Sequence, residues 1–297
     1  MSFAVGIDLG GTSIKAVAVD RAGVELAREQ VAFDPAVRMD WADKIRELVR
    51  RLEAGQGRAA VAVGLSAPGL ADGEGRAIAC MPGRLEGLEG LNWTKFLQRP
   101  SPVPVLNDAH AALLGEVWVG AARGARDVFM LTLGTGVGGA AMVEGRLLRG
   151  HIGRAGHLGH ICLDPEGPPD CTGMPGSLED AIGNGTVGRR SSGRFATTHD
   201  LVAAYLAGDA AASAVWLRSV RALGCAVGSL INVLDPEVVI IGGGVARAGA
   251  ALFEPLEKVV REVEWQPAGA RVRIVPAQLG EMAGAYGAAS QALRGAE

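Results

Sequence analysis

The chain has 297 residues, of which 48% are hydrophobic and 21% charged, and its formal net charge is −3. This composition predicts a folded protein of one large or two medium domains, and so small a charge gives no reason to expect nucleic acid or an anionic membrane as a partner. The four cysteines include no C-x-x-C pair, which favours free thiols over a disulfide framework.

The N-terminal region predicts a cytoplasmic protein. An apolar run begins at Phe3, so we expect neither a signal peptide nor an N-terminal DNA-binding domain. The sequence contains no uninterrupted apolar run of about 18 residues, so no transmembrane helix is predicted.

Two stretches of the chain repeat one pattern. Residues 3–19, FAVGIDLGGTSIKAVAV, and residues 129–143, FMLTLGTGVGGAAMV, each contain an apolar run, a cluster of glycine and threonine, and a second apolar run. Strand, tight turn and strand is the pattern of a β-hairpin. Two copies in one chain predict a duplicated fold with a glycine-rich hairpin in each half.

The two glycine-rich turns are suited to phosphate. Glycine lets the backbone approach an anion closely, and consecutive N–H groups can then point at it. The groups that we expect to hold phosphate are Gly10, Gly11, Thr12, Lys15, Thr132, Gly134, Thr135 and Gly136. Asp8 can reach a bound Mg²⁺ directly or through water. The alternative, that such hairpins are only tight turns, is favoured for a single copy but not for two matched copies.

Two other phosphate motifs are excluded. Gly134, Gly136 and Gly139 fit G-x-G-x-x-G by letter, but that fingerprint opens a helix. Residues 140–145 instead predict a strand and a turn. The chain also has no G-x-x-x-x-G-K-[ST] loop.

Strand and helix patterns alternate along the chain. Beyond the hairpins, strands are expected at residues 24–32, 60–66, 76–80, 102–106, 237–241 and 272–275. Helices are expected at residues 37–53, 91–97, 109–119, 210–234, 249–264 and 282–294. An insert from residue 151 to about residue 198 is rich in Gly, Pro and charge and is not assigned. The alternation predicts two α/β domains with a cleft between them.

Asp108 is the strongest candidate for a catalytic base. It follows a short strand and lies at the start of a helix, at the edge where ligands bind in open α/β folds. In phosphoryl transfer to an alcohol, an aspartate aligns the hydroxyl and accepts its proton. The alternative is that Asp108 only caps the helix, and the local sequence alone favours that interpretation.

Other polar residues are candidates for ligand contacts. Asn107 can hydrogen-bond a substrate hydroxyl or serve as a turn residue. His157 and His160 resemble a metal pair, but further ligands are few, so substrate contact is favoured over zinc. Glu179 is either a substrate ligand or a solvated helix start. Gly242-Gly243-Gly244 suits close approach of a base or ribose, or a tight strand-to-helix connection.

With these motifs assembled, the chain resembles the ROK family of sugar kinases and repressors, within the actin-like, hexokinase-type ATPase fold. Asp8-Leu-Gly-Gly-Thr12 and Leu133-Gly-Thr-Gly136 are similar to the family's two phosphate motifs. Ser66-Ala-Pro-Gly69 is similar to its small-domain loop, which implies Ser66 as a substrate contact. Asn107-Asp108 matches the sugar-binding Asn and catalytic Asp, and Gly242-Gly243-Gly244 resembles the adenosine-contacting segment.

The sequence departs from the family in the insert. Where the family usually has Gly-Glu-x-Gly-His, this chain has Gly156-His-Leu-Gly-His160, so His157 replaces a carboxylate that contacts sugar. The family usually holds a structural zinc with the last His and three cysteines, and Asp170, Thr172 and Ser177 stand at the cysteine positions, with Cys171 out of register. We therefore expect no zinc. Glu179 matches the family's second sugar-contacting carboxylate.

The resemblance implies a duplicated actin-like (ribonuclease H-like) α/β fold and an ATP- and Mg²⁺-dependent kinase for a hydroxyl of a hexose or hexose derivative. We expect a small domain of residues 1–107 and about 281–297, and a larger one of residues 108–280. Asn107, His157, His160 and Glu179 would hold the sugar, and the family implies a homodimer or homotetramer. The alternatives are a sugar sensor without turnover and an actin-like ATPase that needs no sugar.

Overall fold

The computed structural model describes residues 2–81, 83 and 85–295, which form two compact units. The first unit contains residues 1–124, 149–155 and 278–297, and the second contains residues 125–148 and 156–277. The first unit thus continues past residue 107, through the helix that begins at Asp108. It does so because this helix packs closely against the C-terminal helix of the same unit.

The first unit is built on a five-stranded sheet with the order β3-β2-β1-β4-β7. Its strands are β1 (Phe3–Leu9), β2 (Ser13–Asp20), β3 (Glu25–Ala32), β4 (Ala62–Ala67) and β7 (Val105–Asn107). The first three strands pair antiparallel, whereas β4 is parallel to β1 and β7 is parallel to β4. A separate small sheet contains β5 (Leu70–Ala71) and β6 (Ile78–Cys80).

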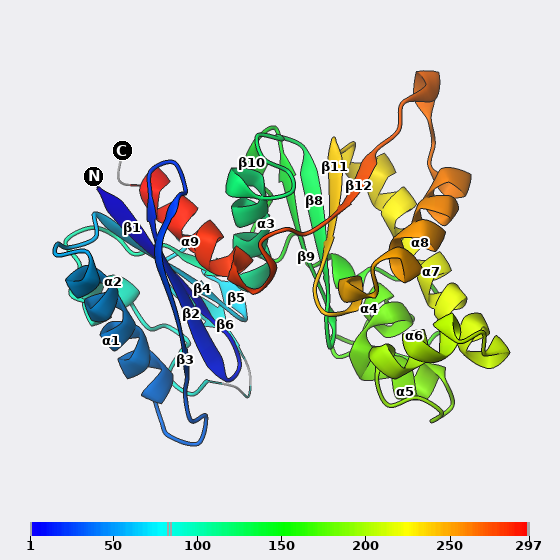
Figure 1. The fold of residues 1–297 in the computed structure, drawn as a ribbon, viewed down its shortest axis with the longest axis horizontal. Coiled ribbons are helices and arrows are strands. Elements are labelled where there is room, and N and C mark those ends of the chain that lie inside the picture. Colours follow the sequence, from blue (N-terminus) through cyan, green and yellow to red (C-terminus); the bar gives the residue numbers. More distant parts are fainter. Residues whose placement is uncertain (1, 82, 84, 296–297) are drawn as a thin grey trace. The chain divides into compact units, whose positions relative to one another are not determined.

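Helices cover both faces of this sheet (Figure 1). On one face lies α1 (Asp40–Gly55), whose buried side chains recur every three to four residues, as in an amphipathic helix. On the other face, α9 (Ala283–Arg294) packs on β1 and β4 and against α3 (Asp108–Val119). The short helix α2 (Trp93–Phe96) contributes Trp93, whose ring lies 5.8 Å from that of Trp41 in the core beneath α1.

The second unit repeats this topology with the order β10-β9-β8-β11-β12. Its strands are β8 (Val128–Leu133), β9 (Val137–Val143), β10 (Arg146–Leu147), β11 (Val238–Gly242) and β12 (Arg273–Pro276). Again the first three strands are antiparallel, and β11 is parallel to β8 and to β12. The duplicated α/β fold that the two hairpins predict is therefore confirmed.

Helices of the second unit bury a single large core. The longest helices, α7 (Ala210–Leu234) and α8 (Ala250–Val263), pack against each other. Shorter elements complete the second unit: η1 (Leu158–His160), α4 (Leu178–Ile182), η2 (Asn184–Thr186), α5 (Val187–Arg190), α6 (Thr198–Leu206), η3 (Val245–Ala248) and η4 (Pro267–Gly269). The short helix η5 (Gly280–Met282) belongs to the first unit. The unassigned insert thus contains several short helices joined by turns.

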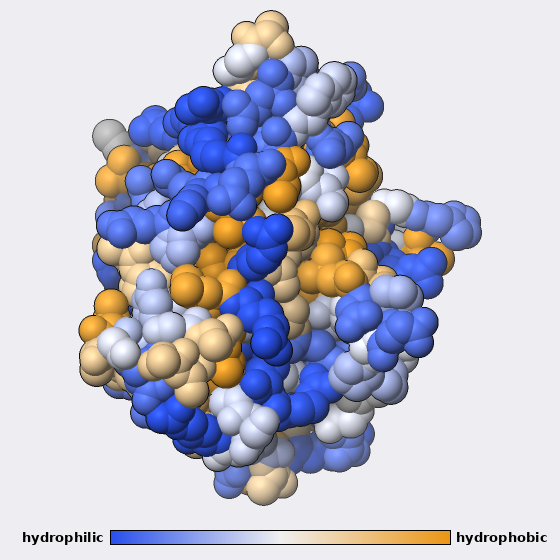
Figure 2. Space-filling view, turned by 90° about the vertical axis from the view of Figure 1, so that its right-hand side faces the viewer, coloured by the Kyte–Doolittle hydropathy of each residue, from blue (hydrophilic) through white to orange (hydrophobic). Residues whose placement is uncertain are grey.

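Helix α7 is long and apolar enough to cross a membrane by length and composition, but 56% of its most apolar window is buried inside the protein. Trp216, Val220, Leu223 and Val227 of this helix lie in the core of the second unit. Burial of this kind is typical of the central helix of a globular domain. On the face shown in Figure 2, hydrophobic residues form small areas among hydrophilic ones.

Candidate functional site

Asp8 and Ser66 lie side by side in the first unit. Asp8 is near the end of β1, and the parallel register of β1 and β4 places it beside Ser66. The Ser66 hydroxyl is completely buried and donates a 2.7 Å hydrogen bond to Asp8 Oδ1. Ser66, which we expected to contact substrate, is therefore placed to orient the Asp8 carboxylate.

The first glycine-rich turn joins β1 to β2. The N–H of Gly10 donates to the carbonyl of Ser13 at 2.9 Å and closes the turn. A side chain at Gly11 would meet nothing within 4 Å, so this part of the turn is open. Lys15 stands opposite Asp8 in the antiparallel register and reaches Glu281, with 3.6 Å between Nζ and Oε2. The turn therefore has an accessible backbone and a cation beside it.

Asn107, rather than Asp108, caps α3. The side-chain oxygen of Asn107 accepts hydrogen bonds from the N–H groups of Ala109 and His110, at 3.0 and 3.3 Å. Its amide nitrogen donates to the carbonyl of Gly69 at 3.0 Å. Asp108 is the exposed first residue of the helix, and its charge is close enough to raise the pKa of Asp8. Asp108 Oδ1 also accepts a hydrogen bond from the N–H of Ala109 at 2.8 Å, but the cap position itself is occupied by Asn107.

The pKa of Asp8 is raised to about 6, mainly by burial and also by the negative charge of Asp108, against the opposing effects of Ser66 and Lys15. A carboxyl group in this state favours a nearby cation, because the cation offsets the unfavourable burial of its charge. Asp8 is thus a suitable ligand for a divalent metal.

The raised pKa of Asp8 predicts a pH-dependent loss of stability in the ligand-free protein. Between about pH 4 and pH 6 the Asp8 carboxyl keeps its proton in the folded state but loses it in the unfolded state. The stabilising contribution of the protonated Asp8 is therefore lost as the pH rises through that window. We expect Asp8→Asn, which keeps an acceptor for Ser66, to be more stable than the unmodified protein by about 3 kcal/mol at pH 8 and to lose this advantage near pH 4. Thermal unfolding at both pH values measures the difference.

The exposed Asp43, whose side chain is 71% accessible, provides the control for this comparison. Asp43→Asn should leave the pH profile of stability unchanged. Parallel profiles for Asp8→Asn and the unmodified protein would show that Asp8 carries no raised pKa.

The second glycine-rich turn, between β8 and β9, is held by hydrogen bonds on several sides. Gly134 N–H donates to the carbonyl of Gly136 at 2.8 Å and closes the turn. The carbonyls of Gly134 and Thr135 accept hydrogen bonds from the N–H groups of Asn184 and Gly185, at 2.9 and 2.8 Å. The turn therefore packs against η2, and these hydrogen bonds fix the conformation of the turn.

Glu179, at the start of α4, also holds this turn. Its Oε2 accepts a 2.9 Å hydrogen bond from the N–H of Val137. A Cβ atom on Gly136 would lie only 2.1 Å from the same oxygen. Glycine at this position therefore leaves room for the Glu179 carboxylate, whose contact with the turn was not among the roles expected from the sequence.

Gly243 links β11 to η3 in a conformation that glycine favours. Its φ angle is +87°, and a Cβ atom there would lie 2.4 Å from the carbonyl oxygen of Leu133. The backbone after β11 is thus packed onto the end of β8. The next residue, Gly244, lines a pocket together with Gly134 and Thr135.

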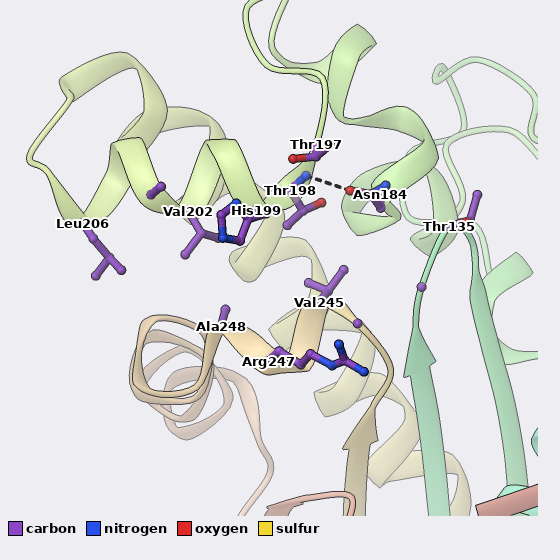
Figure 3. A pocket seen from close by; sticks show the side chains of 13 residues that line it. Thr135, Asn184, Thr197, Thr198, His199, Val202, Leu206, Val245, Arg247 and Ala248 are labelled. Carbon is purple, nitrogen blue, oxygen red and sulfur yellow. Dashed lines mark hydrogen bonds between the residues drawn. The ribbon is translucent and has the colours of Figure 1, made fainter. Parts of the chain in front are cut away.

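This pocket of the second unit has a volume of about 570 Å³, within the range of small-molecule sites. In Figure 3, α6 forms one wall with Val202 and Leu206, and η3 forms the opposite wall with Val245 and Ala248. The remaining lining residues are Gly134, Thr135, Asn184, Thr197, Thr198, His199, Ala203, Gly244 and Arg247. A flat apolar group between these walls would have the second glycine-rich turn at its edge.

Sequence reasoning found one edge of this pocket, at Gly244, but missed the wall formed by α6. The signal was present: Thr197 Oγ1 accepts from the N–H of Asp200 at 3.1 Å and donates to its carboxylate at 2.7 Å. Such a pair three residues apart marks a helix N-terminus. Thr198 was also missed, and its buried hydroxyl lacks a hydrogen-bond partner within residues 2–81, 83 and 85–295.

His157 and His160 flank η1 in the insert, and both are partly buried. A ring nitrogen of His160, the sulfur of Cys171 and a carboxylate oxygen of Glu179 lie within 4.8 Å of one another. His160 Nδ1 is already paired with Asp170 at 2.7 Å. The group offers one imidazole, one thiol and one carboxylate, whereas a structural zinc site has four ligands, almost always cysteine and histidine. Within the described part of the chain, these residues therefore do not match a structural zinc site.

Comparison with known proteins adds four similarities. The model of the ROK family matches residues 4–294. A glucokinase of Thermotoga maritima is 36% identical, over 96% of each chain. A ROK hexokinase from Thermus thermophilus matches with a TM-score of 0.88 and 33% identity over 98% of both chains. A ROK glucokinase from Streptomyces griseus, solved with glucose and AMPPNP, matches with a TM-score of 0.77 and 29% identity over 99% of this chain and 100% of that one.

Proposed function

This chain belongs to the ROK family, and we propose that it is an ATP-dependent sugar kinase that transfers the γ-phosphate to a hydroxyl of a hexose or hexose derivative. Similarity to glucokinases along almost the whole chain supports the activity. The resemblance found from the motifs and the actin-like fold expected from it agree with these relatives.

The pocket beside the second glycine-rich turn is the observation that carries the proposal. A nucleotide needs an apolar slot for its base and backbone donors for its phosphates, and the second unit has both in contact. In our proposal the adenine lies between α6 and η3, with Gly244 and the backbone next to it close to the ribose. The phosphates then follow Gly134, Thr135 and Gly136, with Thr132 at the end of β8.

The first unit contributes the acid–base chemistry and the other phosphate contacts. We assign the proton acceptor to Asp108, since it is an exposed carboxylate at a helix start whose cap is supplied by Asn107. Gly10, Gly11 and Thr12 offer backbone and hydroxyl donors, and Lys15 offers a positive charge. Positioning and charge neutralisation supply most of the rate in phosphoryl transfer.

Mg²⁺ fits Asp8 in this proposal. Ser66 orients the carboxylate. The raised pKa of Asp8 supports this assignment, because a cation would offset the cost of burying the charge. The ion, when bound, would neutralise charge on the phosphates of ATP. The chain's own contribution is to keep the Asp8 carboxylate oriented and beside Lys15.

For the sugar we propose contacts from Asn107, His157, His160 and Glu179. Asn107 has one amide hydrogen beyond the contacts described above, since an amide nitrogen carries two. The replacement of a family carboxylate by His157 changes a pure acceptor into a group that donates one hydrogen bond and accepts one. We therefore expect a sugar preference that differs from that of a strict glucokinase.

The test is sugar-dependent release of ADP from Mg·ATP. The panel contains glucose, mannose, fructose, allose, N-acetylglucosamine and N-acetylmannosamine. Release that depends on one sugar would support the kinase and identify its substrate class. Release without sugar would support an actin-like ATPase, and binding without release would support the sensor. The intact Asp8, Asp108 and paired glycine turns count against a sensor without turnover, and an actin-like ATPase should not need Asn107-Asp108.

A larger side chain in the base pocket should weaken ATP binding selectively. Ala248 lies on η3 and lines the pocket (Figure 3), so Ala248→Phe should raise the KM for ATP by about tenfold or more, which corresponds to ~1.4 kcal/mol. The KM for sugar should stay within about twofold, since the volume filled is that of a base. Steady-state kinetics with each substrate varied separately measure both.

Ala250→Phe is the matched control, because Ala250 is an exposed residue outside the pocket two positions later. A polyphosphate donor has no base, so its use by Ala248→Phe would be unaffected if the unmodified enzyme accepts it. An unchanged KM for ATP in Ala248→Phe would show that the adenine base does not bind in this pocket.

We also propose a cytoplasmic homodimer or homotetramer, in line with what the motifs imply. Light scattering coupled to size exclusion gives the mass in solution, and a mass of about 30 kDa would contradict the oligomer because the chain weighs 30.5 kDa.

A further inference from the structure

Asp170 has a buried carboxylate in an otherwise exposed part of the insert. Its side chain is 0% accessible, whereas the following residues Cys171 to Met174 are all exposed. The segment is not held by a long helix or strand: its only regular pairings among the described residues are single bridges between Pro169 and Pro175 and between Cys162 and Ser177. A buried charge in such a loop requires compensating contacts.

Hydrogen bonds surround the Asp170 carboxylate. Oδ1 accepts from Thr172 N–H at 2.8 Å, Thr172 Oγ1 at 2.7 Å and Met174 N–H at 3.1 Å. Oδ2 is 2.7 Å from Nδ1 of His160. Both oxygens of the carboxylate therefore have donors, Oδ1 from Thr172 and Met174 and Oδ2 from His160.

The contact with Asp170 determines the state of His160. A carboxylate only accepts hydrogen bonds, so Nδ1 of His160 must carry a proton. In the neutral ring the other nitrogen, Nε2, is then an acceptor, because the partner of one nitrogen sets the role of the other. The His160 side chain remains 23% accessible, so a ligand can reach the ring.

We propose that Asp170 is a positioning residue for His160, which it holds with Nδ1 protonated and Nε2 as the acceptor for a sugar hydroxyl, so that a carboxylate does in this chain what a metal ion does in its relatives. The role of His160 toward sugar rests on the proposed function, whereas the pairing with Asp170 does not.

The same residues explain why no metal is needed. His160, Asp170, Thr172 and Ser177 stand where the resemblance places the family's zinc ligands, and here His160 and Thr172 both hydrogen-bond to Asp170. Thr172 and Ser177 present hydroxyls, which are not the nitrogen and sulfur ligands of structural zinc. Folding of the loop around Asp170 thus replaces metal coordination.

The first test is made on the unmodified protein. The metal content of protein purified without added zinc should be below about 0.1 equivalents, and a chelator should leave its thermal stability unchanged, because structural zinc would contribute to folding directly. NMR of the imidazole nitrogens, with His160 assigned by a His160→Gln variant, should show a protonated Nδ1. One equivalent of zinc, or a ring protonated only on Nε2, would overturn the proposal.

The second test separates positioning from a general loss of structure. Asp170→Asn should raise the KM for sugar by about tenfold, the effect of losing one hydrogen bond to a charged group, and leave the KM for ATP within about twofold. Asp164→Asn is the matched control, since Asp164 is an exposed carboxylate in the same insert whose Oδ1 accepts from Glu166 N–H. Equal increases in both KM values for Asp170→Asn would contradict positioning.

A double variant shows whether Asp170 acts through His160. When one residue works only through another, the effects of the two substitutions do not add. Asp170→Asn should therefore add little to the sugar KM of His160→Gln, and full additivity would overturn the proposal. Should the unmodified protein fail to phosphorylate any sugar, the proposed function fails, but the NMR and metal measurements still decide the Asp170–His160 pairing.

Discussion

Turnover of the Asp108→Asn variant is expected to fall between about 10²- and 10⁴-fold, the usual contribution of a general base. An amide cannot accept the proton of the sugar hydroxyl, so the chemical step slows while the nucleotide still binds. The fold should be kept, because Asn107 remains the cap of α3 and the amide oxygen of the new side chain can still accept the hydrogen bond that Asp108 Oδ1 receives from Ala109 N–H. Single-turnover phosphorylation and titration with a non-hydrolysable ATP analogue measure the two properties separately.

Asp40→Asn is the matched control for Asp108→Asn. Asp40 is likewise the first residue of a helix, α1, in the same unit. The control removes a favourable charge at a helix N-terminus, an effect of about 0.3–1 kcal/mol on stability, and should not change the rate. If Asp108→Asn also kept most of its rate, Asp108 would be only a helix-start residue.

Gly287→Ala is expected to destabilise the first unit by about 3 kcal/mol or more, at the upper end of what overpacking costs. Gly287 lies in α9 where this helix crosses α3, and an added Cβ atom would lie 1.7 Å from the carbonyl oxygen of Ala111. Backbone cannot move aside as a side chain can, so the two helices would have to separate. Thermal or urea unfolding measures the loss.

Gly55→Ala is the control for this substitution. Gly55 ends α1, and an added Cβ atom there would meet nothing within 4 Å, so the change should be neutral or slightly stabilising. If Gly287→Ala were as stable as Gly55→Ala, α3 and α9 could not be packed as closely as described. Because Asp108 begins α3, any separation of the helices should also lower activity.

Elements whose signals are local could be predicted from the sequence. Helix α7 was predicted at residues 210–234 and has those bounds, since Asp209 caps its N-terminus and Asp235 ends it in a left-handed conformation before a proline. The duplicated sheets followed from two matching glycine hairpins. Short elements with weak patterns were missed, among them β5, β10 and α6.

Parts of the candidate site depend on contacts that no local pattern contains. Both Asn107 and Asp108 are good caps, and only the structure shows that Asn107 takes that position. The sequence shows that Asp170 stands where a zinc ligand is missing. It does not show that the Asp170 carboxylate accepts hydrogen bonds from residues as far apart as His160 and Met174. The pocket likewise unites residues more than a hundred positions apart, from Thr135 to Ala248.

The hydrogen bond between Glu179 and Val137 has a thermodynamic consequence. Val137, whose N–H donates to Glu179, directly follows the turn proposed to hold the ATP phosphates. If Glu179 also accepts a hydrogen bond from a sugar hydroxyl, this one carboxylate contacts the sugar and the phosphate-binding turn at the same time. Sugar and nucleotide would then bind cooperatively. Reciprocity requires that the factor by which the sugar changes the affinity for ATP equal the factor by which ATP changes the affinity for the sugar, and Glu179→Gln should bring both factors toward one together.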